Sequence, residues 1–299
     1  MQSVSSLAEA SAFLTSATAE KRRVRIGEDL PTDGLDRVLE HEAGDLTATV
    51  EAGIRLSSLN ARLAEAGQRL SLDPPGDPTI GACIAADLSG PRRHRFGTMR
   101  DLVLGVTVVL ADGTIANAGG KVVKNVAGYD LGKLLCGSRG TLALIVRVSL
   151  RLHPTPAASR TLVVSSDDSA GAWAALRRAQ LHPSAVDVLH PGRLAVLFEG
   201  SKAAVAAQLE AARTLAGGEE SGEETWAESR QRQAAARGLV VFEPGQLGET
   251  LAGLDEAIVR AAAGVAYVPG EAAPPVHDAV RALDERVRAA FDPEGILAP

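Results

Sequence analysis

A glycine-rich segment at residues 119–145 constrains this chain more than any other feature. It places Gly128, Gly137 and Gly140 between apolar runs, together with lysines and an asparagine. Glycine lets the backbone approach a ligand where a Cβ would block it. Amide groups at such turns also attract anionic oxygens. The segment therefore predicts a site for a phosphate-bearing cofactor, while a tight structural turn is the alternative that it leaves open by itself.

The elements around this segment follow from its apolar spacing. The run after Asp130 has leucines at helical spacing and stops at Gly137, which predicts a short helix. The β-branched run 142–150 predicts a strand. The turn 138–141 is therefore expected between the end of a helix and the start of a strand.

Three further motifs precede this segment, and the segment itself contains two. In chain order they are Pro-Pro-Gly-Asp-Pro-Thr-Ile-Gly (74–81), Leu-Ser-Gly-Pro-Arg-Arg (88–93), Gly-Thr-Met-Arg-Asp-Leu-Val-Leu-Gly (97–105), Val-Lys-Asn-Val-Ala-Gly-Tyr-Asp (123–130) and Gly-Ser-Arg-Gly-Thr-Leu (137–142). Five motifs in order are far more specific than one glycine-rich loop. Together they resemble the FAD-binding subunits of the vanillyl-alcohol-oxidase (PCMH) type, and among them the E subunits of bacterial glycolate oxidases. The resemblance covers residues 30–155 and the tail 291–299.

The resemblance implies which residues contact FAD. Residues expected along the pyrophosphate and ribityl chain are Pro75, Gly76, Thr79, Ile80 and Gly81. Residues expected to continue that wall are Gly97, Thr98 and Asp101. Residues expected at the flavin or adenine end are Ser138, Gly140, Thr141 and Ile145, with Gly128 and Tyr129 in the adjoining segment.

The sequence departs from the family pattern at the first cofactor loop. The family has an Arg-Gly-Gly-Gly-Ser/Thr loop, whereas the corresponding stretch here is Arg-Ile-Gly-Glu-Asp at 25–29, with Gly27 as its one glycine. Glu28 and Asp29 would repel phosphates if they faced them. Ala82 and Ala143 also replace glycines, and even one extra methyl is felt in a close-packed site. These departures leave open a degenerate flavin site.

Length and composition are those of an ordinary globular protein. The chain has 299 residues, of which 45% are hydrophobic and 23% charged. The length predicts two domains, and the resemblance implies that these are an FAD-binding domain of two α/β subdomains at 1–153 and a reduced cap domain at 154–299. The hairpin signal at Asp112 and Gly113 and the few helices indicate an α+β class and not a doubly wound sheet.

The second half predicts a ferredoxin-like cap. Its apolar runs have the order strand, helix, strand, strand, helix from residue 161 to 215. The acidic run 217–224 is expected to be a flexible loop. A last helix at 275–291 is expected to bury one apolar stripe and to return to the FAD-binding domain. That stripe consists of Val276, Val280, Leu283, Val287 and Phe291.

No catalytic residue is identified from the sequence. The six histidines are scattered and show no metal-ligand spacing, so no metal site is predicted. The two cysteines, Cys83 and Cys136, lie in apolar surroundings that suit packed thiols. They cannot hold an iron–sulfur cluster by themselves.

The negative net charge does not favour nucleic acid as a partner. The net charge is −6, from 31 basic and 37 acidic side chains, and aromatic residues are few. A basic island around His94 is expected to meet an acidic surface or an anionic ligand; it comprises Arg92, Arg93, Arg95 and Arg100. Lys121 and Lys124 could steady flavin charge or lie on a solvated strand face. No apolar run spans a bilayer and the N-terminus lacks signal-peptide order, so a cytoplasmic location is expected, with contact to the inner membrane only through a complex.

The resemblance implies an FAD-dependent oxidoreductase subunit. It would oxidise glycolate or another small 2-hydroxy acid within a heteromeric complex that contains a paralogous FAD-binding subunit and an iron–sulfur subunit. Two alternatives stay open. One is a non-catalytic scaffolding subunit with a degenerate flavin site, and the other is a free-standing FAD oxidoreductase for another small acid.

Overall fold

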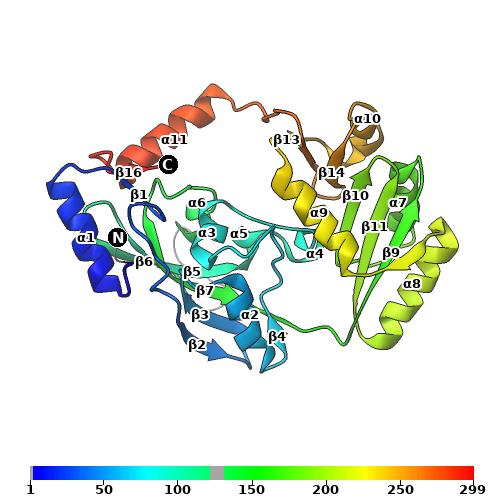
Figure 1. Ribbon diagram of the computed structural model, residues 1–299, viewed down its shortest axis with the longest axis horizontal. Coiled ribbons are helices and arrows are strands. Elements are labelled where there is room, and N and C mark those ends of the chain that lie inside the picture. Colours follow the sequence, from blue (N-terminus) through cyan, green and yellow to red (C-terminus); the bar gives the residue numbers. More distant parts are fainter. Residues whose placement is uncertain (1–2, 122–130) are drawn as a thin grey trace.

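The computed structural model describes residues 3–121 and 131–299, and two large antiparallel sheets dominate it (Figure 1). The first sheet has the order β2-β3-β7-β5-β6, and all its neighbouring strands are antiparallel. Its strands are β2 (Val38–Glu42), β3 (Thr47–Glu51), β5 (Val103–Val109), β6 (Ile115–Gly119) and β7 (Leu144–Arg151). The predicted hairpin at Asp112 and Gly113 joins β5 to β6. The α+β class is confirmed.

Helices cover both faces of the first sheet. On one face α1 (Leu7–Ala19) packs against Leu144 and Val146 of β7. On the opposite face, Ile145 and Val148 belong to a core shared with the remaining helices. Those helices are α2 (Leu56–Ala64), α3 (Ile80–Ala85), α5 (Met99–Leu102) and α6 (Leu131–Leu135). The two apolar layers therefore lie on opposite sides of β7, where a register shift against β5 between Ile145 and Arg147 interrupts the regular alternation of side chains.

The second sheet contains a complete ferredoxin-like unit. The element order β9-α7-β10-β11-α8-β12 gives the strand order β12-β9-β11-β10, and β14, β15 and β13 extend this sheet to seven strands. The strands are β9 (Ala158–Ser165), β10 (Ala185–His190), β11 (Arg193–Gly200), β12 (Glu219–Ser221), β13 (Gly238–Val241), β14 (Ala257–Arg260) and β15 (Val265–Val268). The helices α7 (Ser169–Arg178) and α8 (Lys202–Ala216) pack on one face, and α9 (Glu223–Ala235) packs on the other.

The prediction of a flexible acidic loop at 217–224 is wrong. Residues 219–221 form the edge strand β12, and α9 begins at Glu223. Glu220 forms ion pairs with Arg160 of β9 and Arg213 of α8, and these basic neighbours lower the pKa of its carboxyl through hydrogen bonds. Pairing with distant arginines therefore makes an acidic strand acceptable at this edge.

The C-terminal segment returns to the first sheet region, but its helix is less buried than predicted. In α11 (Asp278–Phe291), Val287 and Phe291 pack against the core beside the first sheet. Beyond it, β16 (Leu297–Ala298) pairs with β1 (Val24–Arg25). The other residues of the predicted buried stripe, Val276, Val280 and Leu283, are 47–56% exposed. The stripe is continuous in sequence, but its first half extends beyond the core that would cover it.

A buried ionic cluster joins the two halves of the chain. Glu199 of β11 accepts hydrogen bonds from Arg69 (2.9 and 2.8 Å) and from Arg92 (3.1 Å), and its side chain is 3% exposed. Arg69 lies in β4 (Gln68–Arg69), which pairs with β8 (His153–Pro154) where the chain crosses between the sheets. Arg92 also pairs with Asp73 at 3.3 Å. We call Arg69, Asp73, Arg92 and Glu199 the junction cluster.

The junction cluster gives part of the basic island a partner within the chain. Arg92 immediately precedes α4 (Arg93–Phe96), and its acidic partner is Glu199 of the second sheet. Burial would raise the pKa of Glu199, but the hydrogen bonds and charges of Arg69 and Arg92 outweigh burial and lower the pKa to about 2. For Asp73 burial dominates over Arg92 and raises the pKa to about 6.

Within the described ranges, no helix is both long and apolar enough to cross a bilayer.

Candidate cofactor site

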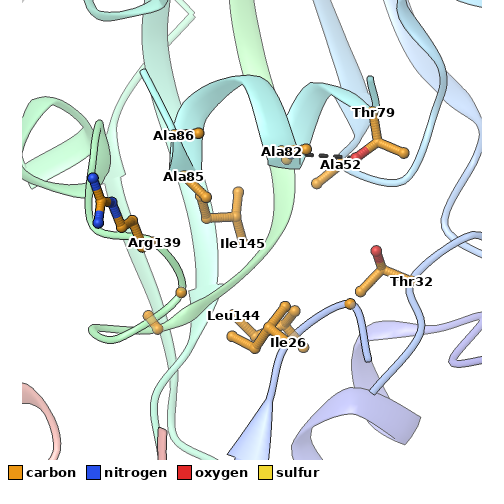
Figure 2. Close-up of a pocket in the computed structure, with 14 residues that line it drawn as sticks. Ile26, Thr32, Ala52, Thr79, Ala82, Ala85, Ala86, Arg139, Leu144 and Ile145 are labelled. Atoms are coloured by element: carbon orange, nitrogen blue, oxygen red, sulfur yellow. Dashed lines mark hydrogen bonds between the residues drawn. The ribbon is translucent and has the colours of Figure 1, made fainter. Parts of the chain in front are cut away.

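A cavity of about 290 Å³ lies between the first loop, helix α3 and the turn that precedes β7 (Figure 2). Thr79 begins its wall: the hydroxyl accepts a hydrogen bond from the amide of Ala82 at 3.2 Å and caps α3. Helical spacing then places Ala85 and Ala86 beside Ala82 on one face. The cavity is lined by Ile26, Gly27, Thr32, Ala52, Thr79, Gly81, Ala82, Ala85, Ala86, Arg139, Gly140, Ala143, Leu144 and Ile145.

The turn opposite α3 needs glycine at Gly140. Its φ of +76° lies in the left-handed region that favours glycine, whereas a Cβ built there would make only an ordinary contact of 3.5 Å with the side chain of Ile26. The preceding residue, Arg139, has a φ of +52°, and its amide donates to the carbonyl of Ala85 at 2.7 Å. The turn is thereby tied to α3, which fixes the width of the cavity.

The first loop turns its two carboxylates toward Arg25. The guanidinium of Arg25 lies 2.8 Å from Glu28 and 3.5 Å from Asp29. The backbone amide of Arg25 also donates to Asp29 at 2.9 Å, and this hydrogen bond is the main cause of the lowered pKa of Asp29. Neither carboxylate lines the cavity. The repulsion of phosphates expected from the sequence is therefore relieved by pairing within the loop.

The cavity brings together some of the predicted site residues and leaves others beside it. Thr79, Gly81, Gly140 and Ile145 line it. The predicted residues that do not line it are Pro75, Gly76, Ile80, Ser138 and Thr141. Ile80 is fully buried in the core, and Gly76 is exposed with a φ of +71°. Gly128 and Tyr129 lie outside the described residues, as does Lys124, whereas Lys121 pairs with Glu40.

Sequence reasoning missed several lining residues. They are Ile26, Thr32, Ala52, Ala85, Ala86, Arg139 and Leu144. A signal existed for some of them. Ile26 belongs to the stretch that replaces the family's first loop, and Ala85 and Ala86 follow Ala82 at helical spacing. Ala82 and Ala143, which replace family glycines, both line the cavity.

The bend at Gly97, Thr98 and Asp101 is used for local structure. Thr98 and Asp101 form a capping box for α5, in which the amide of Thr98 donates to Asp101 at 2.8 Å. A Cβ at Gly97 would lie 2.3 Å from the Asp101 carboxylate, so glycine is required there for packing. None of the three lines the cavity. That they contact FAD outside this cavity stays a prediction.

We expect Asp101→Ala to lower the free energy of unfolding by about 1 kcal/mol, because the capping box is lost. Urea unfolding measures that change. The affinity for FAD should stay at the wild-type value, since Asp101 does not line the cavity. A tenfold loss of FAD affinity in a folded Asp101→Ala protein would show that this bend does contribute to the cofactor site.

The chemistry offered by the described lining is binding and not proton transfer. Arg139 is the one charged side chain among the fourteen described residues that line the cavity, and they include no histidine, lysine or carboxylate. Cys83, on the buried side of α3, is packed in the core, and burial raises the pKa of its thiol to about 12. Glycine and alanine walls with threonine hydroxyls, one cation and an available amide at Gly140 fit a narrow anionic group such as the diphosphate of FAD.

Comparisons with known proteins show what this region is similar to. The model of the FAD binding domain family matches residues 8–119. Glycolate oxidase subunit GlcE of Escherichia coli is 34% identical over 203 residues, which cover 66% of this chain and 56% of that protein. D-lactate dehydrogenase [cytochrome] 1, mitochondrial, of Saccharomyces cerevisiae is 34% identical over 171 residues, or 55% of this chain and 29% of that protein. The chain thus spans little more than half the length of the first relative and less than a third of the second.

The fold itself extends over nearly the whole chain. A solved structure of alkyldihydroxyacetonephosphate synthase superposes with a TM-score of 0.73 at 16% sequence identity, covering 98% of this chain and 74% of that one. At this identity the likeness concerns the fold alone. Residues 8–119 are thus similar to the FAD binding domain family, and the cavity is built from the first loop and α3 of this region together with the turn before β7.

Proposed function

We propose that this chain is the FAD-binding subunit of a glycolate oxidase or dehydrogenase type of complex that oxidises a small 2-hydroxy acid and passes electrons to partner subunits. The observation that carries the proposal is the cavity at α3, which lies in a region whose relatives include glycolate oxidase subunits and a D-lactate dehydrogenase. A cytoplasmic location of the complex is part of the proposal.

FAD, when bound, supplies the two-electron acceptor for such an oxidation. The chain's residues would bind and orient it: Thr79, Gly140 and Arg139 offer polar groups, and the alanines of α3 set the width of the site. The described lining offers no base for a substrate hydroxyl proton. This supports a complex in which a paralogous FAD-binding subunit supplies further groups and an iron–sulfur subunit accepts electrons, since the two cysteines here are too few for a cluster.

An absorption spectrum of the purified chain tests the cofactor. We expect a band at roughly 450 nm, where oxidised flavin absorbs through its own chemistry. Titration of the chain with FAD should restore the band after the cofactor is stripped. A chain that stays colourless after FAD is added would favour the scaffolding alternative, which the altered first loop motivates.

Turnover with an artificial electron acceptor tests the need for partners. We expect the isolated chain to oxidise glycolate poorly and the complex reconstituted with its partner subunits to oxidise it readily. Rapid turnover by the isolated chain would favour a free-standing oxidoreductase. D-lactate and glycolate, compared as substrates of the complex, would define the acid.

A further inference from the structure

We infer that the turn formed by Ser138, Arg139 and Gly140, and not the first loop at 25–30, holds the diphosphate of FAD in this chain. The inference rests on the proposed function, because it assumes that FAD is the ligand. It concerns how a site with an altered first loop still binds a dinucleotide.

Most amides of the first loop are already used. Those of Glu28, Asp29 and Leu30 donate to the carbonyl of Arg25, and that of Gly27 donates to the carbonyl of Leu30 at 3.0 Å. The guanidinium of Arg25 is likewise occupied, by both acidic side chains of the loop. A phosphate at this loop would have to break those bonds before it gained any. The loop therefore supplies shape to the cavity and few donors.

The turn before β7 has donors that remain available. Arg139 is exposed, makes no ion pair within the described ranges, and lies at the edge of the cavity opposite Thr79 and Thr32 (Figure 2). The amide of Gly140 has no partner among the described residues either. The guanidinium of Arg139 and the amide of Gly140 therefore stand on consecutive residues that line the cavity.

The turn is also held in place before any ligand binds. The amide of Gly137 donates to Ile84 at 3.0 Å, that of Arg139 donates to Ala85 at 2.7 Å, and that of Thr141 donates to Ser138 at 3.0 Å. Such preorganisation means that little ordering is left to be done on binding.

The experiment compares three ligands on four proteins. Isothermal titration with FAD, ADP and riboflavin separates the diphosphate from the flavin ring, and the proteins are wild type, Arg139→Gln, Arg139→Lys and Arg178→Gln. Arg178 is a matched control, an exposed arginine in the last turn of α7. We expect Arg139→Gln to weaken FAD and ADP by about 10- to 100-fold and to leave riboflavin unchanged. Arg139→Lys should recover part of the loss, because it keeps the charge without the planar fork.

Each outcome decides the inference. Wild-type affinity of Arg139→Gln for ADP would overturn it, as would an equal loss for riboflavin at an unchanged melting temperature. Arg178→Gln should bind all three ligands like the wild type, and a loss there equal to that of Arg139→Gln would also overturn it. If the wild type binds ADP but not FAD, the proposed function fails while the ADP series still tests the turn; if it binds neither, both fail.

Discussion

Replacing Glu199 with alanine should lower the free energy of unfolding by about 3–5 kcal/mol. The substitution leaves Arg69 and Arg92, whose side chains are 16% and 23% exposed, without their shared carboxylate. An unpaired buried charge destabilises the folded state by more than the intact ion pair stabilised it. Urea unfolding followed by tryptophan fluorescence measures the change.

The matched control is Glu220→Ala. Glu220 also pairs with two arginines, Arg160 and Arg213, but at the exposed edge of the second sheet. Water and salt screen this pair, so the unfolding midpoint should stay near that of the wild type. A Glu199→Ala protein as stable as Glu220→Ala would show that the junction cluster adds nothing to the fold.

The same cluster predicts how stability changes with pH. The pKa of Glu199 is lowered in the folded protein to about 2, from an ordinary value of 4.5. Its stabilisation, about 3 kcal/mol, is therefore fully present above pH 4.5 and is lost as the pH falls from 4.5 through 2. Burial raises the pKa of Asp73 to about 6, so its contribution has the opposite sign and is lost as the pH rises through 6. In Glu199→Gln the loss below pH 4.5 should shrink while the effect near pH 6 remains.

Local sequence patterns predicted much of the fold. Alternation and turn residues were sufficient for the β5-β6 hairpin, and the order of strands and helices was sufficient for the ferredoxin-like unit of the second sheet. The predictions that were wrong concern elements whose structure depends on contacts with residues distant in sequence. The strand β12 is acidic and is accepted because Arg160 and Arg213 neutralise Glu220. The stripe of α11 has ideal spacing, but spacing cannot tell how far the opposing core extends.

The residues of the candidate site were likewise predicted only in part. Motifs at 74–81 and 137–142 do converge on one cavity, as the resemblance implies. The motif at 97–105 does not, because Thr98 and Asp101 satisfy each other in a capping box. The pairing of Arg25 with Glu28 and Asp29 could not be read from composition, since the same residues could have faced the phosphates. Conformation, and not residue type, decided each of these outcomes.

Replacing Ala82 of α3 with phenylalanine should strongly weaken the binding of FAD. Ala82 lies on the exposed side of α3, where its methyl faces the cavity and not the core. In Ala82→Phe the ring would occupy part of a space of about 290 Å³, and we expect the affinity for FAD to fall by about 100-fold. The fold should persist, because no core contact is removed. Flavin fluorescence quenching measures the affinity, and circular dichroism checks the fold.

The control for this substitution is Ala82→Gly, which restores the glycine that the family has at this position. It widens the cavity, so FAD should bind at least as tightly as it does to the wild type, although glycine in a helix costs about 1 kcal/mol of stability. Opposite effects of phenylalanine and glycine on affinity would place the cofactor against α3. A folded Ala82→Phe protein that still binds FAD at wild-type affinity would exclude this cavity as the cofactor site, and the Arg139 series would then lose its premise as well.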